Sequence, residues 1–147
     1  MLFRSVSWGS KVNTVVWVLQ LLLALAMLGS GSAKSFFSKP KILELGQTGV
    51  MHLGISTIRF IGIVELIAVV GIILPWLTNV GAWLTPLTAL GFAIIMVLAY
   101  QTHTRLMLEA IDPTRAKKEA GNRITNVVLL IASVIVVAFR GAQLLSD

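Results

Sequence analysis

The chain has 147 residues, of which 56% are hydrophobic and only 12% are charged. Soluble domains carry about 25% charged residues, so the composition excludes an ordinary water-soluble domain and favours one integral-membrane domain over residues 1–147. The net charge of +6 lies in the connections between apolar runs, where it sets membrane topology, so we predict a lipid-bilayer partner and no nucleic-acid partner. The absence of cysteine excludes a thiol–disulfide relay and a thiolate-ligated iron–sulfur cluster.

Four apolar runs predict an all-α fold, a four-helix transmembrane bundle, because each run is long enough for one crossing. The first run also resembles a secretory signal peptide, since basic residues precede it and small residues follow it. Its length favours a retained span. The predicted helices cover approximately 12–36, 56–77, 82–103 and 122–142.

Two of the connections carry predictions of their own. The segment 39–53 is too polar to span and too apolar for a plain loop, which predicts a short interfacial helix or a re-entrant segment packed against the bundle. Before the fourth run, Asp112 and Pro113 are typical of a helix N-cap and of the first helical position.

The basic residues divide unequally between the two ends of the predicted spans. Three lie on the side of the termini, and nine lie on the side of the connections 38–57 and 104–122. The positive-inside rule then predicts both termini outside and both connections in the cytoplasm. We expect a multi-pass protein of a bacterial inner membrane.

The second span carries a carboxylate, Glu65, about one and a half turns inside its apolar run. A charge near the bilayer centre costs on the order of 2.5–3.5 kcal/mol, so this group must face protein or water, find a partner, or be protonated. Arg59 lies about 120° away around the helix and is not a simple partner. We expect a partner from another helix, which would be Lys34, His103 or Asn126. A functional carboxylate and a structural ion pair both stay open as interpretations.

Polar side chains gather toward one end of the predicted bundle and indicate a cavity that opens to the basic side. The other half is predicted to be a dry plug, with Arg140 reaching out to the interface. Small residues on the first two spans would let neighbouring helices approach closely. The predicted ligand-binding residues are Lys34, Arg59, Glu65, Tyr100, His103 and Asn126, and the predicted helix-packing residues are Gly31, Gly62, Ala68 and Gly71.

Several of these residues form an ordered pattern along the chain. It consists of Gly31-x-x-Lys34, of Arg59-Phe-Ile-Gly62-Ile-Val-Glu65-Leu continuing to Gly71-Ile-Ile-Leu-Pro75, and of His103, Asn126 and Arg140. In order and spacing the chain resembles the DoxX family of small four-helix membrane proteins. That family is named after a subunit associated with quinone-linked sulfur oxidation, some relatives are linked to redox stress, and more distant ones assist receptor assembly. The resemblance implies no agreed reaction.

The leading hypothesis is an accessory, ligand-binding membrane protein whose polar site holds an amphipathic molecule, a quinone or a lipid headgroup. One alternative is a chaperone-like assembly partner of another membrane protein, and another is a quinone-linked oxidoreductase subunit. The expected protein partners are another membrane protein or further copies of this chain. No catalytic residue and no metal site are predicted, and a self-contained enzyme is disfavoured. Quinone is the candidate cofactor. A haem between His52 and His103 is disfavoured, because the chain has only two histidines and no supporting motif.

Overall fold

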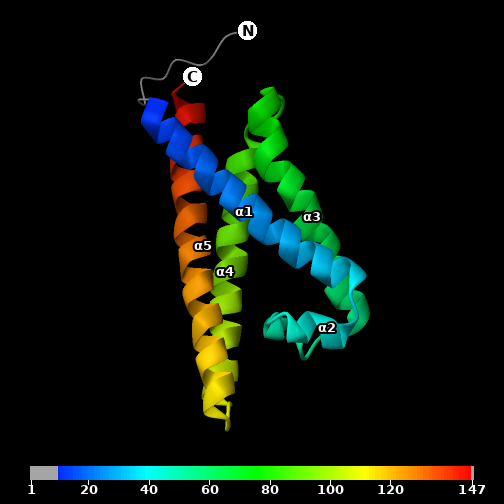
Figure 1. Cartoon of the computed structure of the whole chain (residues 1–147). Helices are drawn as coiled ribbons and strands as arrows, with labels where there is room; N and C mark the ends of the chain where they lie inside the picture. The colour runs from blue at the N-terminus through cyan, green and yellow to red at the C-terminus, as the bar shows by residue number, and fades with distance from the viewer. Residues whose placement is uncertain (1–9, 147) are drawn as a thin grey trace.

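The computed structural model describes residues 10–146, and every regular element in that range is a helix. Residues 1–9 and Asp147, which the predicted domain includes, lie outside it. Four of the helices are apolar and long enough to cross a membrane, which confirms the predicted all-α, four-span architecture. These are α1 (Ser10–Phe36), α3 (Ile55–Thr78), α4 (Leu84–Leu108) and α5 (Pro113–Leu145), and the short α2 (Lys39–Glu44) and the 3-10 turn η1 (Thr48–Val50) connect α1 to α3 (Figure 1).

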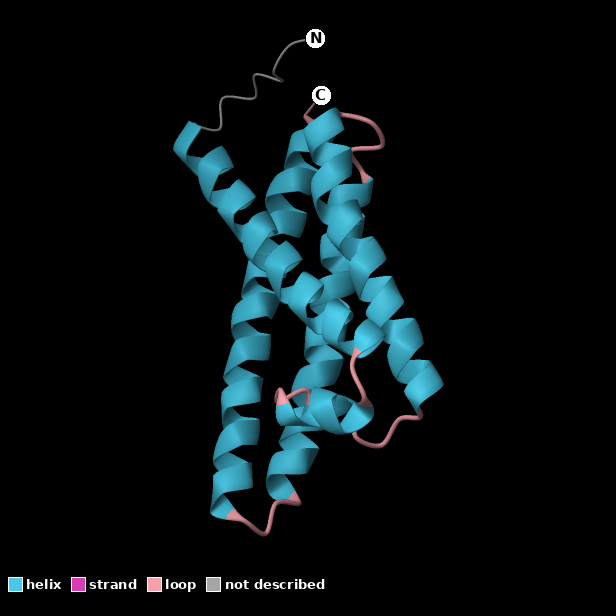
Figure 2. Ribbon diagram, turned by 45° about the vertical axis from the view of Figure 1, so that its right-hand side comes forward, coloured by secondary structure: helices cyan, strands magenta, loops and turns pink. Residues whose placement is uncertain are grey.

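The long helices form two pairs. α4 and α5 run antiparallel and side by side, and α1 crosses them obliquely to pack along α3 (Figures 1 and 2). The beginning of α1 and the end of α5 lie at the same end of the bundle, called here the terminus end (Figure 1). The opposite end holds α2 and the α4–α5 turn and is called the basic end, after the exposed Lys41, Arg115, Lys117 and Lys118.

The main core lies where the two pairs meet, and all four spans contribute to it. Leu23 of α1, Ile72 of α3, Phe92 of α4 and Val136 of α5 are each at most 1% exposed. In lipid the hydrophobic effect adds little between helices, so the close packing of these side chains supplies much of the attraction.

The outward faces of the long helices are also apolar. Leu25, Phe60 and Leu98 belong to three different helices, and their side chains are 57–67% exposed. On a soluble protein such a surface would promote aggregation. Around a bundle of four spans it is the surface that contacts acyl chains, so the exposed residues support a bilayer environment.

The fourth span begins earlier than predicted, at 113 rather than 122, and α4 continues to 108 rather than ending at 103. The Asp112 side chain accepts a hydrogen bond from the Thr114 backbone N–H and Pro113 is the first helical residue, so the helix starts at this cap. The predicted connection 104–122 is therefore wrong in extent, since only 109–112 lies outside the helices. Residues 113–123 are helical although they are polar. One face of this stretch buries Glu119 against the bundle, and another face exposes Lys118.

The connecting segment 39–53 contains the short packed helix that was expected. Ile42 and Val50 pack with Ile58 of α3 in a small core that is separate from the main one. Lys39 Nζ donates a hydrogen bond to the Leu53 carbonyl at 2.7 Å and so joins the two ends of the segment.

Candidate functional site

The predicted ligand-binding residues are divided among three places in the bundle. Lys34, Arg59 and Glu65 lie at the α1–α3 crossing, His103 lies beside η1, and Tyr100 and Asn126 line a pocket between α4 and α5. Of the six residues, Tyr100 and Asn126 line this pocket and the other four do not. The first two places are connected through Ser30, whose hydroxyl accepts from Lys34 and donates to Gln47 Oε1 at 3.3 Å. Each helix pair encloses its own polar groups, because α1 packs mainly on α3 and α4 packs mainly on α5.

At the α1–α3 crossing, Lys34 forms a buried ion pair with Glu65. Lys34 Nζ lies 2.8 and 3.0 Å from the two carboxylate oxygens and also donates to the Ser30 hydroxyl. The two charged residues are 7% and 5% exposed. Arg59 Nη1 donates to the Lys34 carbonyl at 2.8 Å, which also holds α3 against α1. Of the three partners expected for this carboxylate, Lys34 is the one that contacts it, in the geometry of a structural ion pair.

Small residues bring the helices close at this crossing and at the next contact along α3. A Cβ placed on Gly31 would lie 2.9 Å from the Gly62 carbonyl oxygen, and a Cβ on Gly62 would lie 2.9 Å from the Gly31 carbonyl oxygen. A Cβ on Gly71 would lie 2.7 Å from Thr88 Oγ1 of α4. Ala68 packs against the main core. Backbones approach this closely only where a side chain is absent or small.

Beside η1, a second polar contact ties α4 and α5 to the connecting segment. His103 Nδ1 lies 2.6 Å from Glu119 Oε2, and both side chains are buried. The Asn122 amide nitrogen lies within 3.4 Å of that carboxylate, of the Gly46 carbonyl and of the Thr48 hydroxyl. The arrangement therefore holds the segment between α2 and η1 against the α4–α5 pair.

Replacing Asn122 with alanine is expected to loosen residues 46–50 without unfolding the bundle. A hydrogen bond contributes about 0.5–1.5 kcal/mol net, so losing this amide should speed local amide exchange about two- to tenfold. Hydrogen–deuterium exchange of the protein in detergent measures this. Gln101→Ala, at an exposed position of α4, is the matched control and should leave the exchange unchanged. Equal exchange in the two variants would show that the amide does not hold the segment.

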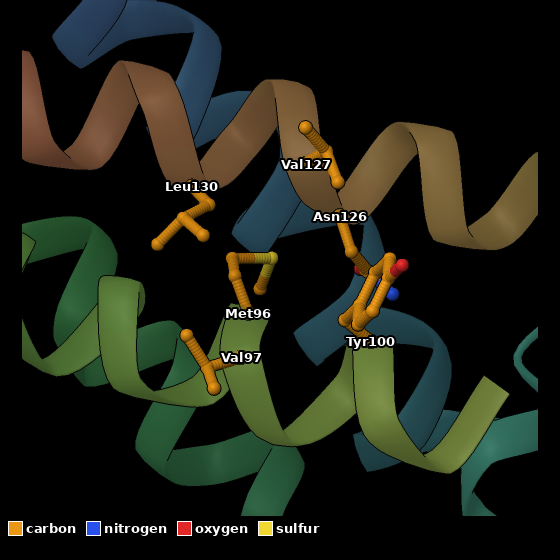
Figure 3. A pocket seen from close by; sticks show the side chains of 6 residues that line it. All are labelled: Met96, Val97, Tyr100, Asn126, Val127 and Leu130. Atoms are coloured by element: carbon orange, nitrogen blue, oxygen red, sulfur yellow. The ribbon is translucent and has the colours of Figure 1, made fainter. Parts of the chain in front are cut away.

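The candidate ligand site is the pocket between α4 and α5, of about 160 Å³ (Figure 3). Val97 and Val127 at its rim are 41% and 39% exposed, so the pocket reaches the outer, lipid-facing surface. Met96 is only 7% exposed and lies deeper. The lining side chains are Met96, Val97 and Tyr100 from α4, and Asn126, Val127 and Leu130 from α5.

Hydrogen-bond donors lie behind the wall of this pocket, around Asn126 and Tyr100. Asn126 Nδ2 is buried and has no hydrogen-bond partner within residues 10–146. The Tyr100 hydroxyl accepts a hydrogen bond from Arg123 Nη2 at 2.6 Å, which leaves its own proton available to donate. The Arg123 guanidinium lies 4.7 Å from the centre of the Tyr100 ring, and its Nε is another buried nitrogen without a partner in the described part of the chain. The surface of the pocket itself is almost entirely apolar and Arg123 does not line it, so these donors and the positive charge lie directly behind its wall.

At the terminus end, the predicted dry plug and the predicted outward reach of Arg140 are both wrong. Arg140 is fully buried and donates from Nε to Gln20 Oε1 at 2.6 Å. Its Nη1 donates to Asn13 Oδ1 and to Gln143 Oε1, each at 2.8 Å. Gln20 donates in turn to the Ile72 carbonyl at 2.8 Å. The side chain turns inward because this polar cluster, shared by α1, α3 and α5, satisfies much of its hydrogen bonding.

Buried roles for Glu119 and Arg140 were not predicted, although the spacing of polar residues along the chain could have indicated them. Seven residues make about two helical turns, so positions seven apart share a face. Buried polar residues recur at that spacing along α5, at Glu119, Asn126, Ser133 and Arg140. Polar residues of α1 lie at multiples of the same spacing, at Asn13, Gln20 and Lys34.

The family to which the chain is similar covers most of the four spans. A model of the DoxX-like family matches residues 18–136. The matched range contains the Lys34–Glu65 crossing and all six residues that line the pocket, and it ends before Arg140. The comparison with curated proteins gave no significant match, and neither did the comparison with solved structures. The family match confirms the resemblance drawn from the helix patterns, and the chain therefore belongs to the DoxX-like family.

Proposed function

We propose that this DoxX-like membrane protein is an accessory protein that binds an amphipathic small molecule in the α4–α5 pocket. The observation that carries the proposal is the buried Asn126 Nδ2, which has no partner among the described residues and stands beside Tyr100 in an otherwise apolar pocket. A buried donor left without a partner costs about 1–3 kcal/mol. A ligand oxygen placed against this amide would offset that cost.

The donors indicate the chemistry of the ligand head. Asn126 and Tyr100 offer N–H and O–H groups, so the head should carry an oxygen acceptor, either a quinone carbonyl or a lipid ester or phosphate oxygen. The positive charge of Arg123 favours an oxygen with partial or full negative charge. The volume of about 160 Å³ is below the ~300 Å³ of ordinary ligand sites. A ring or headgroup would therefore enter the pocket, and the tail would leave between Val97 and Val127 into the bilayer.

The remaining predicted site residues are assigned supporting roles in this proposal. The Lys34–Glu65 ion pair and the Arg59 hydrogen bond fix α1 against α3, and neither the pair nor Arg59 lines the pocket. His103 lies on the same helix as Tyr100, and its contact with Glu119 helps to fix α4 against α5. These groups would hold the helices that shape the site and would not contact the ligand.

We also propose that the basic end faces the cytoplasm, in a bacterial inner membrane. Exposed basic side chains at that end support this orientation by the positive-inside rule, and they are Lys41, Arg115, Lys117 and Lys118. Tyr100 and Asn126 lie in the halves of α4 and α5 nearer the basic end. The ligand head would then lie toward the inner leaflet.

Replacing Asn126 with leucine, which has a similar shape but no amide, is expected to weaken binding of a short-chain quinone at least tenfold. The estimate follows from about 1.4 kcal/mol for one lost hydrogen bond. Isothermal titration calorimetry with decylubiquinone, and separately with lysophosphatidylglycerol, measures the affinity in detergent and distinguishes a quinone from a lipid head.

Thr125→Val is the matched control for this measurement. Thr125 is the preceding residue of α5, is exposed, and its hydroxyl bonds to the Gly121 carbonyl of its own helix at 3.2 Å. The affinity of the Thr125→Val variant for either probe should equal that of the parent protein. If neither probe binds the parent, or if Asn126→Leu binds as tightly as Thr125→Val, the proposed site is wrong.

A further inference from the structure

The Arg140 cluster at the terminus end lies apart from the proposed ligand pocket and holds a buried positive charge. Its guanidinium carbon lies 4.4 Å from the centre of the Trp76 ring and 5.3 Å from that of Trp17. The hydrogen-bond partners of Arg140 within residues 10–146 are neutral amides, and no carboxylate of that range forms an ion pair with it. A charge enclosed in a membrane bundle is costly unless an opposite charge compensates it.

Two buried donors, one on α4 and one on α5, lack acceptors within residues 10–146. Arg140 Nη2 is buried without a hydrogen-bond partner in the described range, and the same holds for the hydroxyl of Thr85, a residue that is 0% exposed. A guanidinium nitrogen can only donate, and a threonine hydroxyl has a proton to donate. Both groups therefore need an acceptor, and one acceptor would serve both if they lie at the same level of the bundle.

Contacts between the helices place Thr85 and Arg140 at the same level of the bundle. α4 and α5 are antiparallel, and Tyr100 is bonded to Arg123. Thr85 lies 15 residues before Tyr100, and Arg140 lies 17 residues after Arg123. At about 1.5 Å per residue the two positions differ by only about 3 Å along the helix axes. Contacts of α3 agree with this level. Gly71 lies against Thr88, one turn from Thr85, and the next residue, Ile72, accepts a hydrogen bond from Gln20, the partner of Arg140.

We propose that Arg140 and Thr85 bind a small monovalent anion of the halide class. The anion would accept hydrogen bonds from Arg140 Nη2 and from the Thr85 hydroxyl, and its charge would compensate the guanidinium. A small anion is favoured over a phosphate or a carboxylate-bearing ligand, because Gln20, Thr85 and Arg140 are each 0% exposed and a large ligand could not reach the two donors.

The two tryptophans that flank Arg140 provide the measurement. In a Trp8→Phe/Trp83→Phe background, Trp17 and Trp76 remain, and bromide bound beside them should quench their fluorescence. Bromide is titrated against gluconate at constant ionic strength in detergent. We expect quenching that saturates and that chloride reverses, since chloride competes for the site and does not quench. Quenching that rises linearly with bromide and is insensitive to chloride is collisional and would overturn the proposal.

Variants of the two donors test the site itself. Thr85→Val keeps the shape of the side chain and should weaken the saturable response about tenfold. Thr88→Val, one turn further along α4, is the matched control and should respond as the background does. Arg140→Met should abolish the saturable quenching by bromide. If Arg140→Met does not fold, Thr85→Val still tests the site. Equal responses of Thr85→Val and Thr88→Val would contradict the site.

A final variant tests whether a carboxylate of the chain itself compensates Arg140. Asp147 is an acidic residue that lies outside the described range. Asp147→Asn should leave the bromide affinity unchanged if a free anion compensates Arg140. A saturable response that appears only in Asp147→Asn would show that the chain's own carboxylate occupies the site, and would overturn the proposal.

Discussion

Replacing Glu65 with alanine is expected to lower the free energy of unfolding by about 3–5 kcal/mol. The substitution leaves the Lys34 ammonium buried at the α1–α3 crossing without its carboxylate, and both residues are less than a tenth exposed in the parent protein. An unpaired buried charge is more costly than a missing pair, so the double variant Lys34→Met/Glu65→Leu should recover much of the loss. Reversible unfolding in mixed detergent micelles, followed by circular dichroism, measures the three free energies.

Glu109→Ala is the control for the loss of a carboxylate as such. Glu109 is exposed at the end of α4 and forms no ion pair with any residue of 10–146. A surface substitution of this kind should change the free energy of unfolding by no more than about 0.5 kcal/mol. If Glu65→Ala and Glu109→Ala unfold alike, the ion pair does not stabilise the crossing.

Replacing Gly31 with alanine is expected to lower the free energy of unfolding by about 1–3 kcal/mol, through overpacking. The added Cβ would lie 2.9 Å from the Gly62 carbonyl oxygen and 3.1 Å from both Glu65 Cβ and Leu66 Cγ. The first of these atoms belongs to the backbone, so it cannot move aside as a flexible side chain can. α1 would have to shift away from α3, which would also disturb the nearby ion pair.

Gly29→Ala tests the same change of residue two positions earlier on the same helix. A Cβ there would meet no atom within 4 Å. Alanine restricts the unfolded chain more than glycine and favours the helix, so this variant should gain about 0.5–1 kcal/mol. The same unfolding measurement compares the two variants. Losses of similar size at both positions would mean that the close approach at Gly31 is not what determines stability.

The spans were predictable because lipid imposes a simple rule, that a crossing helix is a long apolar run. The beginning of α5 was not placed correctly, although the Asp112–Pro113 cap was recognised. Residues 113–123 are too polar to count as part of a span. A helix that leaves the apolar layer can continue when tertiary contacts satisfy its polar face, as the buried Glu119 does here.

The candidate site was predictable residue by residue but not as an arrangement. The sequence identified Glu65 as a group that needed a partner and included Lys34 among the candidates, because polar groups at similar depth can pair. Depth alone does not give the rotation of each helix or the choice of neighbour, which follow from packing. For that reason Tyr100 and Asn126 meet in a pocket apart from the ion pair, and Arg140 turns into the bundle rather than out of it.

Photolabelling with an azido-substituted ubiquinone, mapped by mass spectrometry, tests the central claim most directly. The claim is that the α4–α5 pocket receives the polar head of an amphipathic molecule, with Asn126 and Tyr100 donating to it. Label is expected on the peptides that contain residues 96–100 and 126–130, displaced by excess decylubiquinone and lost in Asn126→Leu. Label concentrated at the α1–α3 crossing around Glu65, or spread evenly over the lipid-facing helix surfaces, would contradict the claim.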